Sequence, residues 1–489
     1  MEKKESRSEL LIYNILVFGL STVISKLMTF ILSPIYTRYF TPEEYGVFDL
    51  TIIIVSIVQI ISLLGITEAV FRLYFDKDDM EHRSTVISTG LKLAFLGTLI
   101  ASTAIFIFND RLAVYFLGNV QFVDYINLGI VLIFLINITS VTQAIVRMEN
   151  NRKLIVQITL IQAFITLVLS IFFVVVLRLD LRFVLAVKAI SLFIVFVITY
   201  NYGKKYINLN QLKPDKEVAN NIFRYGLPLI PVFIGYWVMS GADRMMLNHF
   251  MGTGAVGLYA IGSKLSQIMN LFQVIFAKGW QYFGFSTMTS EDAPRLYGKI
   301  FDFIVLIGLL GTTFLLFYSD FLFMILFSAS YYEAWIVSPI LAVGPILMVL
   351  RWISAIGYFK EKKTYIDTAS VMIAVIVNLA LNYILIQYYG IFGAAIATLI
   401  AYIALLGSTY SFGSRYLKID SSNGLLLFSC VLLASSFFVK YVYLEKLFFY
   451  STSGFLVYAI IYCLIYKHSI KEVYTKLMPM IKKTTRRLP

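Results

Sequence analysis

Six basic side chains lie inside stretches of sequence that are otherwise apolar and long enough to cross a membrane: Lys26, Lys92, Lys188, Arg244, Lys264 and Arg351. A charge that faces hydrocarbon at mid-membrane costs about 2.5–3.5 kcal/mol on the insertion scale, and six such costs would offset much of the stability of a typical domain. We therefore expect most of these side chains to face a water-filled path, an acidic partner or a membrane interface. Such a cationic path suits an anionic substrate group.

Depth in the apolar stretch separates the six residues. Lys26 lies mid-stretch and Lys264 lies about 13 Å into its own at 1.5 Å per residue, so both are predicted to line the path. Lys92 has a similar depth. Lys188 and Arg351 lie nearer a membrane face, where a long side chain can place its charge in water while its carbon stem stays in lipid. For these two residues, both a substrate contact and this simple interfacial placement stay open.

Charged neighbours suggest gates or ion pairs. Arg244 follows Asp243, and adjacent helical residues point about 100° apart, so the two need not pair with each other. We interpret Arg244 as either an ion-pair partner of another helix or a gate or phosphate contact. Glu68 and Arg72 are one helical turn apart, a spacing that allows an i,i+4 pair at the cytoplasmic mouth.

Signals for enzymatic chemistry are weak. The segment from Gly257 to Lys264 looks like a phosphate-binding loop, but its last two residues are in the wrong order and it lies within an apolar stretch. Cys430 and Cys463 lie in the last two apolar stretches and support neither a disulfide nor a metal site. We expect no enzyme, metal or cofactor, with H+ or Na+ as candidate coupling ions.

The elements that must position these residues are membrane-spanning helices. The chain has 489 residues, of which 59% are hydrophobic and 14% charged, and its apolar runs of 20 or more residues each suffice to cross about 30 Å of hydrocarbon. We predict an all-α integral membrane protein with about fourteen transmembrane helices. The predicted spans are 11–35, 46–70, 85–108, 122–146, 154–177, 183–202, 222–248, 255–277, 300–318, 333–357, 366–388, 391–413, 424–443 and 447–466.

Basic residues in the connections give the orientation. Alternate connections and the termini carry 29 Lys and Arg residues and the opposite connections carry six, Lys440 among them, so both termini are predicted to be cytoplasmic. The net charge of +13 is then mostly a topology signal. A nucleic-acid partner would need a basic soluble domain, which the sequence does not contain. The basic segment 467–489 is interpreted as a cytoplasmic tail, either an interfacial helix on anionic lipid or a solvated chain.

Short matches between the two halves of the chain recur at offsets of 210 to 212 residues. The period contains an even number of spans, so we predict two parallel six-helix repeats around a central cleft, plus two additional helices at the carboxyl end. The predicted domains are an amino-terminal bundle (1–203), a cytoplasmic linker (204–220), a second bundle (221–414), two additional helices (415–466) and the tail (467–489).

Helix-breaking residues indicate where the bundles could bend. Pro228 and Pro231 remove two backbone donors within one turn, and Pro34 lies near the end of the first span. Gly46 and Gly257 are predicted to mark equivalent periplasmic turns. We expect hinges at these five positions and an alternating-access movement.

Residues in the repeated hairpins carry a family resemblance. They are Ser25–Leu27, Arg38–Gly46, Gly65–Arg72, Tyr225–Pro231, Asp243–Arg244, Gly257–Ala260 and Lys264, in order along about residues 8–415. The pattern resembles the polysaccharide-biosynthesis (Wzx-type) flippases of the multidrug/oligosaccharidyl-lipid/polysaccharide exporter superfamily. The resemblance implies a bacterial inner-membrane protein that moves an undecaprenyl-diphosphate-linked oligosaccharide to the periplasmic leaflet for a surface polysaccharide such as O-antigen or capsule. A monomer is expected, with membrane lipids, a polysaccharide polymerase and glycosyltransferases as further candidate partners.

Three alternatives stay open at this point. A multidrug/cation antiporter of the same superfamily should have a cleft dominated by acids, whereas bases outnumber acids within these spans. A flippase for the peptidoglycan lipid precursor would share the cationic cleft and the two additional helices. A membrane glycosyltransferase or polymerase would need catalytic carboxylates or a large extramembrane loop, and the sequence shows neither.

Overall fold

The structure is a computed structural model that describes residues 7–208, 213–420, 423–442 and 448–467. Helices and short connections account for these residues, and no strand occurs among them, which confirms the predicted all-α class. Nine helical stretches of the described residues are long and apolar enough to cross a membrane, so the count of fourteen stays a prediction. The predicted tail lies outside the described residues from residue 468 onward.

The chain divides into two compact units. The amino-terminal unit is Leu20–Ala260, and the carboxy-terminal unit is Ile261–Pro489 together with Met1–Gly19. This division follows packing: the segment after the linker contacts α2 and α3 and so belongs with the first unit. The predicted boundary at residues 204–220 follows the sequence repeat instead, and it stays a prediction.

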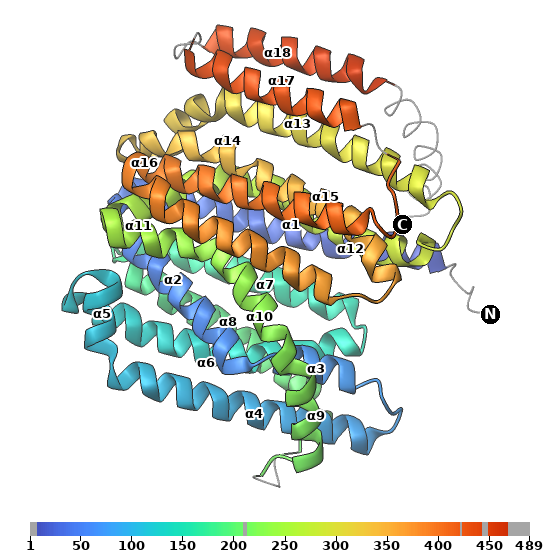
Figure 1. Cartoon of the computed structure of the whole chain (residues 1–489). Coiled ribbons are helices and arrows are strands. Elements are labelled where there is room, and N and C mark those ends of the chain that lie inside the picture. Colours follow the sequence, from blue (N-terminus) through green and yellow to red (C-terminus); the bar gives the residue numbers. More distant parts are fainter. Residues whose placement is uncertain (1–6, 209–212, 421–422, 443–447, 468–489) are drawn as a thin grey trace. The chain divides into compact units, whose positions relative to one another are not determined.

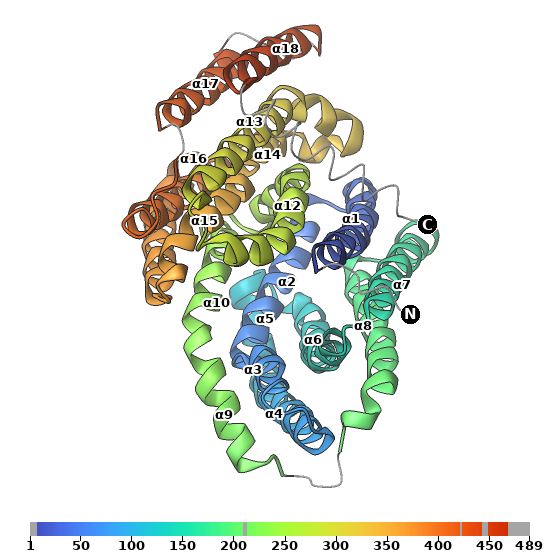
Figure 2. The ribbon, with the colours of Figure 1, turned by 90° about the vertical axis from the view of Figure 1, so that its right-hand side faces the viewer.

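A central helix organises the amino-terminal unit. α6 lies between α4 and α8 and also packs on α2, while α9 and α10 run along α2 and α3 (Figures 1 and 2). The helices of this unit are α1 (Arg7–Tyr39) from Leu20 onward, α2 (Pro42–Leu63), α3 (Ile66–Leu73), α4 (Met80–Ile107), α5 (Asn109–Leu117), α6 (Val123–Met148), α7 (Arg152–Ile171), α8 (Leu181–Gly203), α9 (Lys216–Gly226), α10 (Ile230–Trp237), α11 (Asp243–Met251) and the start of α12 (Thr253–Thr287), as far as Ala260.

Local sequence sets where α2 begins. The Thr41 hydroxyl accepts a hydrogen bond from the backbone N–H of Glu44, and the Glu44 carboxylate accepts one from the Thr41 N–H, which is a capping box. Gly46 is therefore a helical residue and not part of a turn, which corrects the prediction. The same correction applies to Gly257, because α11 ends at Met251, Gly252 (φ +82°) forms the turn, and α12 begins at Thr253.

The span that contains Pro228 and Pro231 is interrupted. Pro228 lies in a 3-10 turn, Leu227–Leu229, between α9 and α10, and a π-helical turn, Val238–Ala242, separates α10 from α11. Proline lacks an N–H and cannot complete the regular ladder, which accounts for the 3-10 turn at Pro228, whereas the π-helical turn contains no proline. Helix α1, by contrast, continues through Pro34. Movement about these positions stays a prediction.

The carboxy-terminal unit is built on α13, which packs against α15, α17 and α18. Within α16, Gly390 has φ +55° and joins two helices, and the predicted boundary between two spans falls at this glycine. The helices are α12 (Thr253–Thr287), α13 (Ala293–Leu326), α14 (Val337–Leu341), α15 (Val343–Lys360), α16 (Tyr365–Gly413), α17 (Asn423–Val442) and α18 (Phe448–Ile465).

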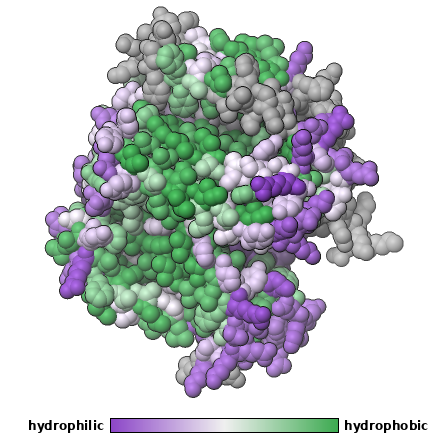
Figure 3. Space-filling model, in the orientation of Figure 1, coloured by the Kyte–Doolittle hydropathy of each residue, from purple (hydrophilic) through white to green (hydrophobic). Residues whose placement is uncertain are grey.

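Hydropathy on the surface agrees with burial in a bilayer. On the face drawn in Figure 3, hydrophobic side chains cover the middles of helices and hydrophilic side chains gather at helix ends. Large apolar side chains on α4 are strongly exposed, among them Ile100 at 71% and Ile107 at 67%. A soluble protein rarely exposes so much apolar surface, so these faces contact lipid.

Candidate functional site

Two neighbouring cavities in the amino-terminal unit have polar walls. Their volumes are about 500 Å³ and about 470 Å³, and both have Ser56 and Gln59 of α2 in their walls. The aromatic cavity is lined by Ser56, Gln59, Ile60, Leu63, Gly65, Thr67, Glu68, Ser140, Arg147, Phe233, Tyr236, Trp237 and Ser240. The amide cavity is lined by Ser25, Thr29, Ile52, Val55, Ser56, Gln59, Leu132, Ile136, Gln162, Ala163, Thr166, Lys188, Ser191 and Leu192.

The aromatic cavity combines opposite charges with aromatic rings. Glu68 of α3 and Arg147 at the end of α6 are both exposed at its wall, and Phe233, Tyr236 and Trp237 of α10 line it. Apolar and aromatic walls with a few polar groups are typical of ligand sites. This cavity can therefore accept a ligand that has both hydroxylated and apolar faces.

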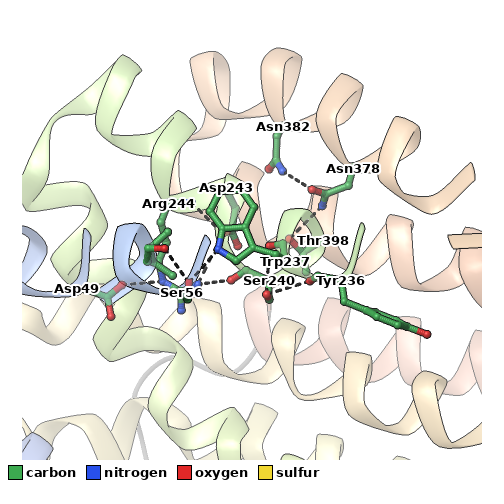
Figure 4. A network of polar contacts seen from close by, with 11 residues as sticks. Asp49, Ser56, Tyr236, Trp237, Ser240, Asp243, Arg244, Asn378, Asn382 and Thr398 are labelled. Atoms are coloured by element: carbon green, nitrogen blue, oxygen red, sulfur yellow. Dashed lines mark hydrogen bonds and ion pairs between the residues drawn. The ribbon is translucent and has the colours of Figure 1, made fainter. Parts of the chain in front are cut away.

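Hydrogen bonds fix the walls of the aromatic cavity. The Trp237 Nε1–H donates to the Ser56 hydroxyl at 2.9 Å (Figure 4), which holds α10 against α2. The Thr67 and Ser140 hydroxyls are 3.1 Å apart and join α3 to α6. The indole has two anchors, its ring packing and its N–H, so its position is well defined.

Arg244 forms a buried ion-pair cluster next to α2. Its Nε lies 2.8 Å from Asp49 Oδ2 and its Nη1 lies 3.7 Å from Asp243 Oδ1 (Figure 4). The same Nη1 donates to the Ser240 carbonyl at 2.6 Å, and the guanidinium lies over the Tyr259 ring. The structure therefore shows Arg244 as an ion-pair partner of another helix, and a gate or phosphate role stays a prediction.

Backbone contacts join both ends of α2 to the interrupted span and α12. A Cβ at Gly46 would overlap the Thr253 carbonyl, and one at Gly257 would overlap the Pro42 carbonyl. At the other end, Gly65 (φ +73°) lies against Gly226 of α9. Because only glycine fits such contacts, these positions set how closely the helices approach.

The structure places the predicted lysines in different surroundings. Lys188 lines the amide cavity, with its Nζ 4.9 Å from the Phe48 ring centroid. Lys26 is exposed on α1 and lines neither cavity. The Lys92 Nζ reaches the backbone carbonyl of Lys213 at 3.4 Å, at the linker. Lys264 is half-buried on α12 in the carboxy-terminal unit.

Two of the predicted basic residues, Arg72 and Arg351, have acidic partners in the structure. Arg72 pairs with Asp76, one turn further along, and not with Glu68. Glu68 instead turns to the aromatic cavity. Arg351 is 2% exposed and pairs with Asp367, which also accepts a hydrogen bond from the Tyr358 hydroxyl at 2.6 Å.

Lys440 was expected in an outer connection, and this expectation is wrong. It lies on α17 with 4% exposure, and its Nζ is 2.8 Å from Asp320 Oδ2 of α13 and 3.0 Å from the Ser451 hydroxyl of α18. A buried ammonium needs such partners. Lys440 therefore ties the two additional helices to α13.

Buried amides also form a polar cluster within α16. Asn382 donates to the Asn378 side chain at 3.1 Å, and Asn378 lies 3.5 Å from the Thr398 hydroxyl (Figure 4). Asn378 and Asn382 are fully buried. The contacts join the two helices that meet at Gly390.

A further polar cluster, formed by Tyr74, Glu149, Lys205 and Tyr206, lies at helix ends outside the predicted spans. The Tyr74 hydroxyl donates to Glu149, and the Lys205 Nζ lies 3.6 Å from Glu149 Oε2. Burial opposes ionisation of Glu149, but the hydrogen bonds from Tyr74 and Tyr206 and the nearby Lys205 charge outweigh it and lower the pKa of Glu149. Burial, followed by the hydrogen bond to Glu149, raises the pKa of Tyr74.

The two cavities are also lined by uncharged side chains that the sequence analysis did not predict. Ser56, Gln59, Gln162 and Trp237 line the cavities and none was singled out from the sequence. A glutamine within an apolar span could have indicated them, because an uncharged amide also costs free energy in hydrocarbon and therefore favours a polar cavity.

Comparison with known proteins gives one family and several relatives. The sequence model of the family described as polysaccharide biosynthesis protein matches residues 11–279. The uncharacterized membrane protein MJ1068 of Methanocaldococcus jannaschii is 22% identical over 415 residues, 78% of this chain and 80% of that protein. The probable low-salt glycan biosynthesis flippase Agl15 of Haloferax volcanii is 26% identical over 220 residues, 43% of this chain and 46% of that protein.

Solved structures share the fold. The lipid II flippase MurJ in an inward closed conformation has a TM-score of 0.74 at 15% identity, with 95% of this chain and 100% of that chain covered. An inward-facing multidrug resistance MATE family transporter of the MOP superfamily has a TM-score of 0.67 at 15% identity, with 82% and 97% covered. At these identities the likeness establishes the fold alone.

Proposed function

This protein belongs to the polysaccharide biosynthesis protein family, whose sequence model matches residues 11–279 of its 489, and from that premise we propose that it is a flippase for a lipid-linked glycan. The finer proposal is that it moves undecaprenyl-diphosphate-linked oligosaccharide repeat units from the cytoplasmic to the outer leaflet for surface polysaccharide synthesis. Its place would be the bacterial inner membrane, with both termini cytoplasmic.

The pair of polar cavities inside an otherwise apolar bundle carries this proposal. The lipid tail of such a substrate can stay in the bilayer, whereas its hydroxylated, anionic head needs a polar route. The amide and aromatic cavities supply hydroxyls, carboxamides, aromatic rings and the cations Lys188 and Arg147. Cations stabilise a diphosphate, and hydroxyls and amides exchange hydrogen bonds with sugars.

Alternating access is the mechanism that we propose. The interrupted segment from α9 to α11 contains Pro228 and Pro231, and α1 contains Pro34. In transporters built from repeats, discontinuous helices of this kind form the substrate site, and alternating access is rocking of one repeat against the other around it. H+ or Na+ is the proposed coupling ion, alongside the substrate gradient.

Two alternatives make different demands on the cavities. A multidrug/cation antiporter needs acids to meet cationic drugs, but the two cavities contain one acid, Glu68, against the bases Arg147 and Lys188. A flippase for the peptidoglycan lipid precursor would carry the same diphosphate. The family match to polysaccharide biosynthesis favours the oligosaccharide substrate over this second alternative.

Depletion of the protein in its native cell tests the proposal. Lipid-linked oligosaccharide should accumulate on the cytoplasmic leaflet, where an externally added glycosidase cannot reach it. Accumulation of a peptidoglycan precursor instead would transfer the function to the second alternative. Unchanged lipid-linked glycans together with increased sensitivity to cationic drugs would favour the antiporter.

A further inference from the structure

We propose that the amide cavity is a sugar-binding subsite, in which Gln59 and Gln162 hydrogen-bond sugar hydroxyls and Lys188 binds an anionic substituent of that sugar. This inference rests on the proposed function and deepens it, because it names the part of the substrate that the amino-terminal unit holds. The cavity is formed by α1, α2, α6, α7 and α8, so the subsite lies entirely within one unit.

The hydroxyl protons around the cavity already donate to backbone carbonyls, so the hydroxyl oxygens can act as acceptors. Thr29 donates to the Ser25 carbonyl at 2.9 Å, Ser56 to the Ile53 carbonyl at 2.7 Å, and Ser191 to the Lys188 carbonyl at 2.9 Å. Each hydroxyl has one proton and two lone pairs. Ser56 uses one lone pair to accept from the Trp237 Nε1–H and keeps one. Thr29 and Ser191 keep theirs, so these oxygens can accept from hydroxyl donors of a ligand.

The two carboxamides lack partners of their own. Gln59 on α2 and Gln162 on α7 are half-buried, and neither side chain makes a hydrogen bond within the described residues. An amide that lines a cavity without a protein partner can exchange hydrogen bonds with a bound molecule, through its two N–H donors and its carbonyl acceptor. Both amides line the same cavity, so a single bound molecule can form hydrogen bonds with both. Each amide offers N–H donors and a carbonyl acceptor to such a molecule.

Lys188 adds the only formal charge that lines this cavity among the described residues. Its Nζ lies near the face of Phe48, at 4.9 Å from the ring centroid, where the ring stabilises the cation. A neutral, amide-rich wall with one cation suits a sugar that carries a phosphate or a carboxylate.

Size and position fit a sugar unit. The volume of about 470 Å³ lies within the range of ligand sites, roughly 300–1,000 Å³. Ser56 and Gln59 also line the aromatic cavity, so a glycan that occupies one cavity adjoins the other. The aromatic rings of α10 can then contact a neighbouring sugar while Gln59 and Gln162 hold the first.

Binding of soluble head-group mimics to the full-length protein tests the subsite. We would use lipid nanodiscs, because maltoside detergents are themselves sugars, and detect binding by saturation-transfer NMR. The probes are the 1-phosphates of a hexose, an N-acetylhexosamine, a deoxyhexose and a uronic acid, each with its unphosphorylated sugar, and inorganic phosphate alone. At least one sugar is expected to bind, and inorganic phosphate alone is expected to bind more weakly.

Variants identify the residues. The double variant Gln59→Leu/Gln162→Leu should weaken sugar binding by about tenfold or more, the order expected for several lost hydrogen bonds. Gln143→Leu is the matched control, because Gln143 is a half-buried glutamine of the same unit that lines neither cavity. Lys188→Gln should remove the preference for the anionic form of the sugar while unphosphorylated sugar still binds.

Several outcomes would overturn the subsite. They are no binding by any probe, equal binding by the double variant and the parent, or an equal loss in Gln143→Leu. Gln162→Asn keeps an amide and should retain part of the affinity, which separates a lost contact from a damaged fold. Flipping of a lipid-linked glycan in proteoliposomes by a protein that binds no probe would refute the subsite alone. Absence of flipping would refute the proposed function.

Discussion

Removal of Arg244 should destabilise the amino-terminal unit strongly, because it leaves two acids without their shared partner. At 2.8 Å from Asp49 the gross attraction is roughly 6 kcal/mol for an effective dielectric of 20, and desolvation of both charges offsets much of it. The Arg244 and Asp49 side chains are 15% and 16% exposed and Asp243 is 4% exposed. Breaking such a pair from one side costs about 3–5 kcal/mol.

The assay is the free energy of unfolding in detergent, measured by SDS titration with circular dichroism. Arg244→Met should lose about 3–5 kcal/mol, whereas Asp49→Asn should lose less, because Arg244 keeps Asp243 as a partner. The double variant Arg244→Met/Asp49→Asn should be more stable than Arg244→Met, with a coupling energy of about 0.5–3 kcal/mol. Arg38→Met, at an exposed arginine, is the control and should change stability by less than about 0.5 kcal/mol.

Additive effects of the two substitutions would refute this reasoning, because they would mean that Arg244 and Asp49 do not stabilise each other. A loss below about 0.5 kcal/mol in Arg244→Met, the range of ordinary surface substitutions, would refute it as well.

Three further predictions concern other parts of the molecule. Gly46→Ala should destabilise the protein, because its Cβ would overlap the Thr253 carbonyl, whereas Gly407→Ala should not, since nothing lies within 4 Å there; equal thermal stability of the two variants would contradict this. Glu149→Gln should lower the free energy of unfolding by about 1–2 kcal/mol at pH 7. Because the pKa of Glu149 is lowered in the folded protein, this difference from the parent should disappear as the pH falls below the ordinary carboxyl value of 4.5 and Glu149 becomes protonated. A difference that is constant from pH 7 to pH 3 would exclude this source of stability. A cysteine at Lys213 should react with an impermeant reagent only from the cytoplasm and one at Thr253 only from outside, and the reverse pattern would overturn the orientation.

Local features of the fold could be predicted from the sequence because their causes are local. Gly390 separates two apolar runs, and the structure has a left-handed residue there. Pro228 and Pro231 lie in one span, and that span is interrupted around them. The prediction failed at Gly46 for an equally local reason, since the capping box starts α2 several residues earlier.

Contacts between distant residues could not be predicted in this way. Asp49 and Arg244 are 195 positions apart, and which faces of two helices meet depends on rotations that hydropathy does not determine. Lys440 was placed outside because it lies near the end of its apolar run, yet Asp320 and Ser451 give it a buried site. Of the cavity residues, Lys188 could be predicted because a charge within an apolar span is conspicuous. Gln59 and Gln162 are uncharged and were not predicted.

Flipping of a lipid-linked oligosaccharide in proteoliposomes that contain only this protein tests the central claim most directly. A fluorescent undecaprenyl-diphosphate-linked glycan is placed in the inner leaflet, and a membrane-impermeant lectin or glycosidase reports its arrival outside. The protein should accelerate this arrival well beyond protein-free vesicles. Arg147→Gln/Lys188→Gln, which removes the cations of the two cavities, should abolish the acceleration, and Lys77→Gln/Lys418→Gln, at two exposed connector lysines, should not. Glycan arrival at the protein-free rate with correctly folded, correctly inserted protein would contradict the account.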